Sequence, residues 1–208
     1  MELQLVHHLV VNADGSIPET PNSLYAYIMA RNGVFVYAKR SGLEALIPVS
    51  ACKIAGLPEL TPQVHIAKRV PVFLLDYALR FCKKVFPNEA LFWFNWTDDW
   101  SIHIPVQRIT NASTVPCDRH DQTGTSALID LHSHARFSPF FSATDNRDEV
   151  GFRLYAVIGN VDKVPTMSVR VGVYSHYFNV PASTAFEMPD GIKDMYEQEN
   201  TTYEAESR

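Results

Sequence analysis

The stretch LIDLHSHARFSPFFSATDNRDE, residues 128–149, decides the fold and points to the chemistry of this chain. Its first residues alternate between apolar and polar, which predicts a β-strand. Residues two apart on a strand point to the same face, so His132 and His134 are expected to direct both imidazoles at one point. Leu131 and Ser133 then face away. Two imidazoles on one strand face indicate a metal site, although two histidines at a strand end could also be one buried and one solvated.

A third ligand can come from the segment that follows. Catalytic zinc usually has three protein ligands from His and carboxylate side chains and keeps one open position. The connection of residues 135–144 contains a proline and is long enough to turn back, so Asp145 is expected opposite the histidines. Ser142 stands three residues before Asp145, which also predicts a capping box at a helix start. A cap is compatible with a metal ligand, but a cap alone would tie Asp145 to the Ser142 amide and leave no metal bound.

The pattern of His-x-His, ten residues and Asp, with a serine three before the Asp, resembles the motif of the JAMM (JAB/MPN+) zinc metalloproteases. The glutamate of that family lies at the start of the strand after the first long helix. The stretch FPNEALFWF, residues 86–94, is similar to this arrangement and nominates Glu89. Ala135 departs from the family pattern, in which a proline often follows the second histidine. The resemblance covers residues 71–180.

The resemblance implies an α/β (α+β) fold, namely an MPN/JAB-type mixed β-sheet sandwiched by helices. It implies one zinc ion with a water as the fourth ligand, and the protein ligands His132, His134 and Asp145. Glu89 would move a proton from that water to the leaving amine, and Ser142 would donate a hydrogen bond to the oxyanion. The implied activity is that of a peptidase or isopeptidase acting at the C-terminal tail of a ubiquitin-like protein.

A narrower resemblance is to the A proteins of the PRTRC (ParB-related, ThiF-related cassette) systems of bacterial mobile elements. It depends on the central motif and on two further stretches, NGVFVYAKRSGLEALIPV at residues 32–49 and RVGVYSHYF at residues 170–178. Such cassettes encode ThiF-like activating proteins beside JAB-domain proteins. The partners implied are a ubiquitin-like protein or its conjugates, and a ThiF-like activating protein of the same cassette.

Other interpretations stay open at this point. A JAB-fold binding or scaffold module with little or no turnover is the main alternative function, and zinc hydrolysis of a small amide or desulfurisation of a thiocarboxylated carrier are others. Glu89 could be an exposed acid at a strand edge, and other acids could be the base: Glu44, Glu59 and Glu149. The remaining histidines are expected at the surface or in satisfied positions: His65, His103, His120 and His176. Three tryptophans are expected to pack in the core rather than form a binding wall: Trp93, Trp96 and Trp100.

The sequence as a whole predicts three units. Residues 1–62 form a small β-rich unit, because two apolar runs flank Asn32-Gly33, a strong hairpin signal. Residues 63–182 form the JAB/MPN domain, which begins with a helix over residues 71–85 and ends with one long strand over residues 166–180. The helix is expected to bury one face: Leu74, Tyr77, Ala78, Phe81 and Val85. Residues 183–208 are acidic and are expected to be a mobile tail.

Composition excludes some functions. The net charge is −5 and the lysines and arginines are scattered, so nucleic acid is not an expected partner. No run of about 18 apolar residues predicts a membrane span, and no basic start with a long apolar stretch predicts a signal peptide. We therefore expect a cytoplasmic protein. Its three cysteines have no CxxC spacing and are expected to be free thiols.

Overall fold

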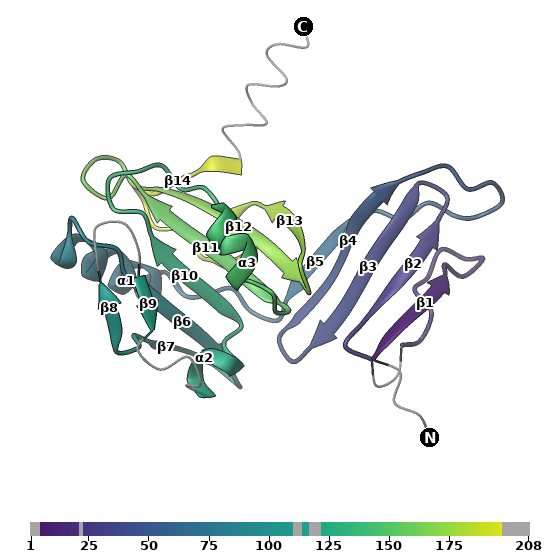
Figure 1. Ribbon diagram of the computed structural model, residues 1–208, viewed down its shortest axis with the longest axis horizontal. Coiled ribbons are helices and arrows are strands. Elements are labelled where there is room, and N and C mark those ends of the chain that lie inside the picture. Colours follow the sequence, from purple (N-terminus) through teal and green to yellow (C-terminus); the bar gives the residue numbers. More distant parts are fainter. Residues whose placement is uncertain (1–4, 21–22, 110–113, 117–121, 197–208) are drawn as a thin grey trace, which may run out of the picture.

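The computed structural model describes residues 5–20, 23–109, 114–116 and 122–196, and within them two mixed β-sheets dominate the chain (Figure 1). Cys117 and His120 lie outside these ranges. The smaller sheet has its strands in chain order: β1 (Val6–Val10), β2 (Tyr25–Ala30), β3 (Gly33–Arg40), β4 (Leu43–Ala51) and β5 (Gln63–Ile66). A separate small hairpin pairs β8 (Gln107–Ile109) with β9 (Thr114–Pro116).

The larger sheet carries the predicted motif on a central strand. Its order is β13-β12-β11-β10-β6-β7, with β14 beside β12. The strands are β6 (Leu91–Trp96), β7 (Trp100–His103), β10 (Ile129–Ser133), β11 (Arg153–Gly159), β12 (Thr166–Val173), β13 (His176–Val180) and β14 (Lys193–Asp194). Strand β10 runs parallel to β11 and antiparallel to β6. This mixed sheet confirms the α/β (α+β) fold class.

The helices are α1 (Val72–Val85), α2 (Gln122–Ser126), α3 (Ala143–Asp148) and α4 (Ala182–Ala185). Helix α1 packs on the larger sheet with Leu74 and Ala78 buried, as predicted, but the rest of its buried face differs from the predicted one. Leu75 and Cys82 are buried, whereas Tyr77 is 47% exposed. The buried stripe therefore includes Leu75 and Cys82 in place of Tyr77. No helix in the described part of the chain is long and apolar enough to cross a membrane.

Strand β10 separates the core from the predicted site. Ile129 and Leu131 are fully buried in the main hydrophobic cluster, with Phe92 and Phe94 of β6. Because side chains alternate along a strand, His132 lies on the opposite face. The sequence predicted this division of the strand correctly.

The N-terminal sheet shares that core. Val36 and Ile47 belong to the same cluster as Phe94, and Arg40 at the end of β3 donates to the carbonyl oxygens of Ser126 and Phe152 at 2.9 and 3.1 Å. Its last strand, β5, lies past residue 62 and still pairs with β4. The sheet thus extends past residue 62, where the N-terminal unit was predicted to end, and it shares its core with the larger sheet.

The predicted single strand over residues 166–180 is a hairpin. Strands β12 and β13 pair antiparallel, and Tyr174 and Ser175 form the turn with φ values of 46° and 73°. The dipeptide Tyr-Ser gives no turn signal of the Asn-Gly kind, so alternation alone suggested one continuous strand. Val169 and Val171 are buried on one face, as predicted.

The segment from Ser183 onward, expected to be a mobile tail, is packed as far as it is described. Phe186 is fully buried and Ile192 is nearly so, and both belong to the main core. The Val70 amide donates to the carbonyl oxygen of Ala185 at 2.8 Å. Pairing of β14 with β12 and a hydrogen bond from the Ala182 amide to Asp194 Oδ2 at 2.6 Å attach the segment further, although its overall composition is acidic. Residues 197–208 lie outside the described part of the chain.

Candidate metal centre

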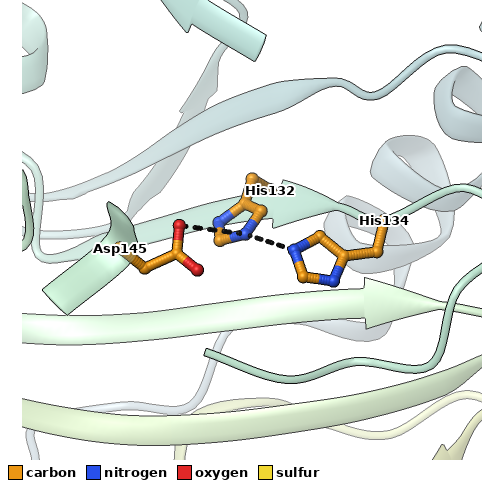
Figure 2. Close-up of side chains that lie close together, drawn as sticks. All are labelled: His132, His134 and Asp145. Atoms are coloured by element: carbon orange, nitrogen blue, oxygen red, sulfur yellow. Dashed lines mark hydrogen bonds and ion pairs between the residues drawn. The ribbon is translucent and has the colours of Figure 1, made fainter. Parts of the chain in front are cut away.

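The Nε2 atoms of the two motif histidines face each other. His132 lies in β10 opposite Leu91 and Val157, and His134 follows directly after the strand. The Nε2 atoms of His132 and His134 are 3.1 Å apart. Figure 2 shows the two rings joined by this contact. The strand geometry therefore places two nitrogen donors at one point.

Asp145 in α3 completes a group of three donors. Its Oδ1 lies 3.8 Å from His132 Nε2, and one ligand atom from each of the three residues lies within 4.8 Å of the others (Figure 2). Ligands about 2.1 Å from a tetrahedral zinc ion are about 3.4 Å from one another. Two of the three separations, 3.1 and 3.8 Å, lie on either side of this value and all three lie within 4.8 Å, so the residues could hold a zinc ion.

The Asp145 carboxylate also forms the predicted capping box. Its Oδ2 accepts a hydrogen bond from the Ser142 amide at 2.5 Å, and the Asp145 amide donates to Ser142 Oγ at 3.2 Å. The two carboxylate oxygens thus have separate partners. The cap uses Oδ2 and fixes the side chain, while Oδ1 remains directed at the imidazoles. Ser142 Oγ accepts the amide hydrogen and keeps its own proton for donation.

A backbone carbonyl sets the tautomer of His134. Nδ1 of His134 lies 3.3 Å from the carbonyl oxygen of Ser138. A carbonyl only accepts, so Nδ1 carries the hydrogen and Nε2 keeps its lone pair for a metal. Ser138 could not be predicted from a side-chain pattern, because the group that acts is its main-chain carbonyl.

The loop that supplies this carbonyl is fixed against the end of β11. The His134 amide donates to the carbonyl oxygen of Ile158 at 2.8 Å, and the Asn160 amide donates to that of Phe137 at 2.8 Å. Gly159 permits this approach, since a Cβ there would lie 2.3 Å from the Phe137 oxygen. Ala135 has a φ of 43°, which proline cannot adopt, so the departure from the family pattern suits this backbone.

Burial keeps both imidazoles neutral. Desolvation lowers the pKa of His132 well below its usual range, and the neighbouring His134 lowers it further, against the opposite effect of Asp145. Desolvation also lowers the pKa of His134, against the effects of Ser138 and Asp145. Neutral imidazole is the form that binds metals, so the pair is ready to act as ligands at neutral pH.

Glu89 lies beside this group because of the pairing between β6 and β10. Ser133 and Ala90 exchange hydrogen bonds of 2.9 Å, one of them through Ser133 Oγ. Glu89 directly precedes Ala90. Its side chain is only 7% exposed, so it is not the exposed acid at a strand edge that the alternative interpretation expected. Burial raises the pKa of Glu89 to about 7, and the Asp145 charge adds to this rise. A buried carboxyl with a pKa near neutrality suits a general base.

The three competing glutamates each lie near a basic side chain. Glu44 forms an ion pair of 2.8 Å with Lys39 on the N-terminal sheet, and Glu59 is exposed near Arg31. Glu149 is buried and paired with Arg170. Of these four glutamates, Glu89 is therefore the strongest candidate for a general base, because it is buried, has a raised pKa and senses the charge of Asp145.

The other aromatic and histidine candidates have structural roles. Trp93 and Trp100 are buried, which favours the packing interpretation. His103 stacks on Trp93, and His176 Nε2 lies 2.8 Å from the hydroxyl of Tyr27.

The chain was also compared with known protein families and with curated proteins. The family model described as "Prokaryotic homologs of the JAB domain" matches residues 72–172, which run from the start of α1 into β12 and include the metal centre. The search of curated proteins found no match.

Proposed function

Because residues 72–172 belong to the family of prokaryotic JAB domains, we propose that this protein is a zinc-dependent peptidase or isopeptidase of the JAMM type. The observation that carries the proposal is the convergence of three donors with a buried acid beside them. His132, His134 and Asp145 fit one metal ion, and Glu89 lies next to them with a raised pKa. A complete set of this kind supports turnover over a role as a binding module alone.

The residues of the site have separate roles in metal binding and proton transfer. A zinc ion held by the three donors would supply Lewis acidity to the scissile carbonyl and acidify a water ligand. Glu89 takes a proton from the attacking water and returns it to the leaving amine. Its burial favours both steps, because a carboxyl with a pKa near 7 exchanges a proton readily at neutral pH.

Ser142 stabilises the charge that develops on the substrate oxygen. Its Oγ accepts from the Asp145 amide, so its orientation is fixed while its proton stays available. An oxyanion donor of this kind contributes about 3 kcal/mol to transition-state stabilisation.

The substrate we propose is the C-terminal tail of a ubiquitin-like protein, either in a precursor or in a conjugate. The rim beside His134 carries Phe137, which is 62% exposed, and Phe140 in ring contact with His134. Exposed aromatic side chains suit the apolar contacts of an extended peptide, whose backbone would form hydrogen bonds beside the site. A cytoplasmic PRTRC or other bacterial ubiquitin-like cassette with a ThiF-like activating protein is the setting that the sequence resemblance favours.

Glu89→Gln tests the proposal. The substrate is a ubiquitin-like protein carrying a short C-terminal extension, and product is followed by mass spectrometry. We expect wild type to release the extension, Glu89→Gln to bind zinc equally and not to cleave, and the control Glu59→Gln to cleave normally. Loss of zinc on Glu89→Gln would mean that Glu89 is a ligand. Zinc binding by wild type without cleavage of such precursors or conjugates would favour the scaffold alternative.

A further inference from the structure

Helix α3 carries Asp145 but has no apolar attachment of its own. None of its residues, Ala143–Asp148, is buried. A helix of six residues does not persist in water without tertiary contacts. The position of the Asp145 carboxylate must therefore depend on polar contacts made around the helix.

Those contacts converge on Arg170, a buried arginine of β12 that is 4% exposed. Its Nε donates to Glu149 Oε2 at 2.9 Å, and Nη2 contacts the same oxygen. Its Nη1 donates to Asn146 Oδ1 at 2.6 Å. One guanidinium thus binds a residue within α3 and the residue that follows its last turn.

Two aromatic rings enclose the guanidinium. The Arg170 carbon Cζ lies 4.0 Å from the ring centre of Phe141 and 3.9 Å from that of Tyr177. Phe141 directly precedes Ser142, the N-cap of α3. The Tyr177 hydroxyl lies 2.9 Å from the carbonyl oxygens of both Asn146 and Glu149. Arg170 and Tyr177 together hold the start, the middle and the end of the segment that carries Asp145.

We infer that Arg170 is a positioning residue, whose guanidinium clamps the α3 segment so that the Asp145 carboxylate is set for metal binding. The inference rests on the proposed function, because it assumes that Asp145 is a ligand. A buried ion pair such as that of Arg170 with Glu149 adds little net stability, but it fixes geometry. The Glu149 amide also donates to the carbonyl oxygen of Asp145 at 2.8 Å, which links the clamped residue directly to the ligand.

Lysine cannot replace Arg170 in this role. The clamp needs a planar group that stacks between two rings and donates in two directions, and an ammonium has neither the plane nor the fork. Groups that orient metal ligands typically change metal affinity by 10- to 100-fold when they are replaced. We therefore expect Arg170→Lys to weaken zinc binding by about this factor while its charge is kept.

The experiment measures Co²⁺ and zinc binding to the metal-free full chain. Co²⁺ is titrated by its visible absorption, and zinc by competition with a chromogenic chelator. Arg153→Lys is the matched control, because Arg153 lies on the neighbouring strand and donates to the carbonyl oxygens of Gly124 and Thr125 in α2. We expect tetrahedral Co²⁺ bands in wild type and Arg153→Lys, and weaker binding with altered bands in Arg170→Lys. The melting temperature of each metal-free variant shows separately whether the fold has been weakened.

The outcomes distinguish the two proposals. No Co²⁺ or zinc binding by wild type would overturn the proposed function. Normal binding by wild type with unchanged affinity and bands in Arg170→Lys would overturn the clamp alone, and so would a lower melting temperature with unchanged affinity. If Arg170→Lys does not fold, the metal affinity of Glu149→Gln tests the clamp instead. Glutamine keeps the shape of the Glu149 side chain and removes its charge. We expect weaker metal binding there too, and an unchanged affinity would refute the clamp.

Discussion

Replacing Asp145 by asparagine separates the two roles of this side chain. Oδ2 accepts from the Ser142 amide at 2.5 Å, and Oδ1 faces His132 Nε2 at 3.8 Å. Asparagine can keep the first contact through its carbonyl oxygen, but it then presents an amide NH₂ group to the imidazoles. The change therefore weakens the cap slightly and removes the anionic ligand.

The two effects differ in size. Loss of charge in the cap costs about 0.5–1 kcal/mol, which lowers the melting temperature of the metal-free chain by roughly 1–4 °C. Zinc at about 1,000 times its dissociation constant stabilises the wild type by about 4 kcal/mol, or roughly 8–16 °C. If the lost ligand weakens binding by about 100-fold, the same zinc concentration stabilises Asp145→Asn by only about 1.4 kcal/mol, or roughly 3–6 °C.

The assay is thermal unfolding of chelator-treated protein with and without zinc. Asp148→Asn is the control, because Asp148 is exposed at the end of the same helix and is not among the three donors. Equal zinc-induced shifts in wild type and Asp145→Asn would refute the ligand role and leave only the cap.

Three further changes test other parts of the site. Ser142→Ala should lower kcat by about 100-fold with zinc retained, because the oxyanion loses its donor; unchanged kcat would remove Ser142 from the mechanism. Gly159→Ala should lower both the melting temperature and the zinc affinity, since its Cβ would lie 2.3 Å from the Phe137 oxygen and displace the loop beside His134; normal values of both would contradict this. Glu89→Gln should raise the melting temperature of the metal-free protein at pH 8, and this gain should vanish toward pH 4.5. Because the pKa of Glu89 is higher in the folded protein than in the unfolded chain, the wild type loses stability as the pH rises from the unfolded-chain value toward 7. An equal gain in melting temperature at both pH values would refute the raised pKa.

The metal donors followed from local rules. Alternation along residues 129–133 placed His132 on the face away from the core, and the spacing to Ser142 and Asp145 gave a capping box that the structure contains. Both depend on residues close in sequence, where the periodicity of strands and the chemistry of helix starts act directly.

What the sequence could not predict depends on contacts between distant segments. Glu89 was nominated by the family resemblance alone, because the register of β6 against β10 that sets its position is not specified by residues 86–94 themselves. The carbonyl of Ser138 acts through the main chain, so no side-chain pattern marks it. Arg170 is one polar residue in an alternating strand, and no local pattern marks the contact of its guanidinium with the segment around Asp145. The turn at Tyr174 and the packing of Phe186 were missed for the same reason, because tertiary contacts override weak local signals.

The central claim is that His132, His134 and Asp145 hold one zinc ion. Metal analysis of purified full-length protein, wild type against His132→Ala, tests it most directly, with circular dichroism to show that both are folded. We predict one equivalent of zinc in wild type and almost none in His132→Ala. A folded wild type that takes up no zinc, or a His132→Ala variant that keeps a full equivalent, would contradict the claim.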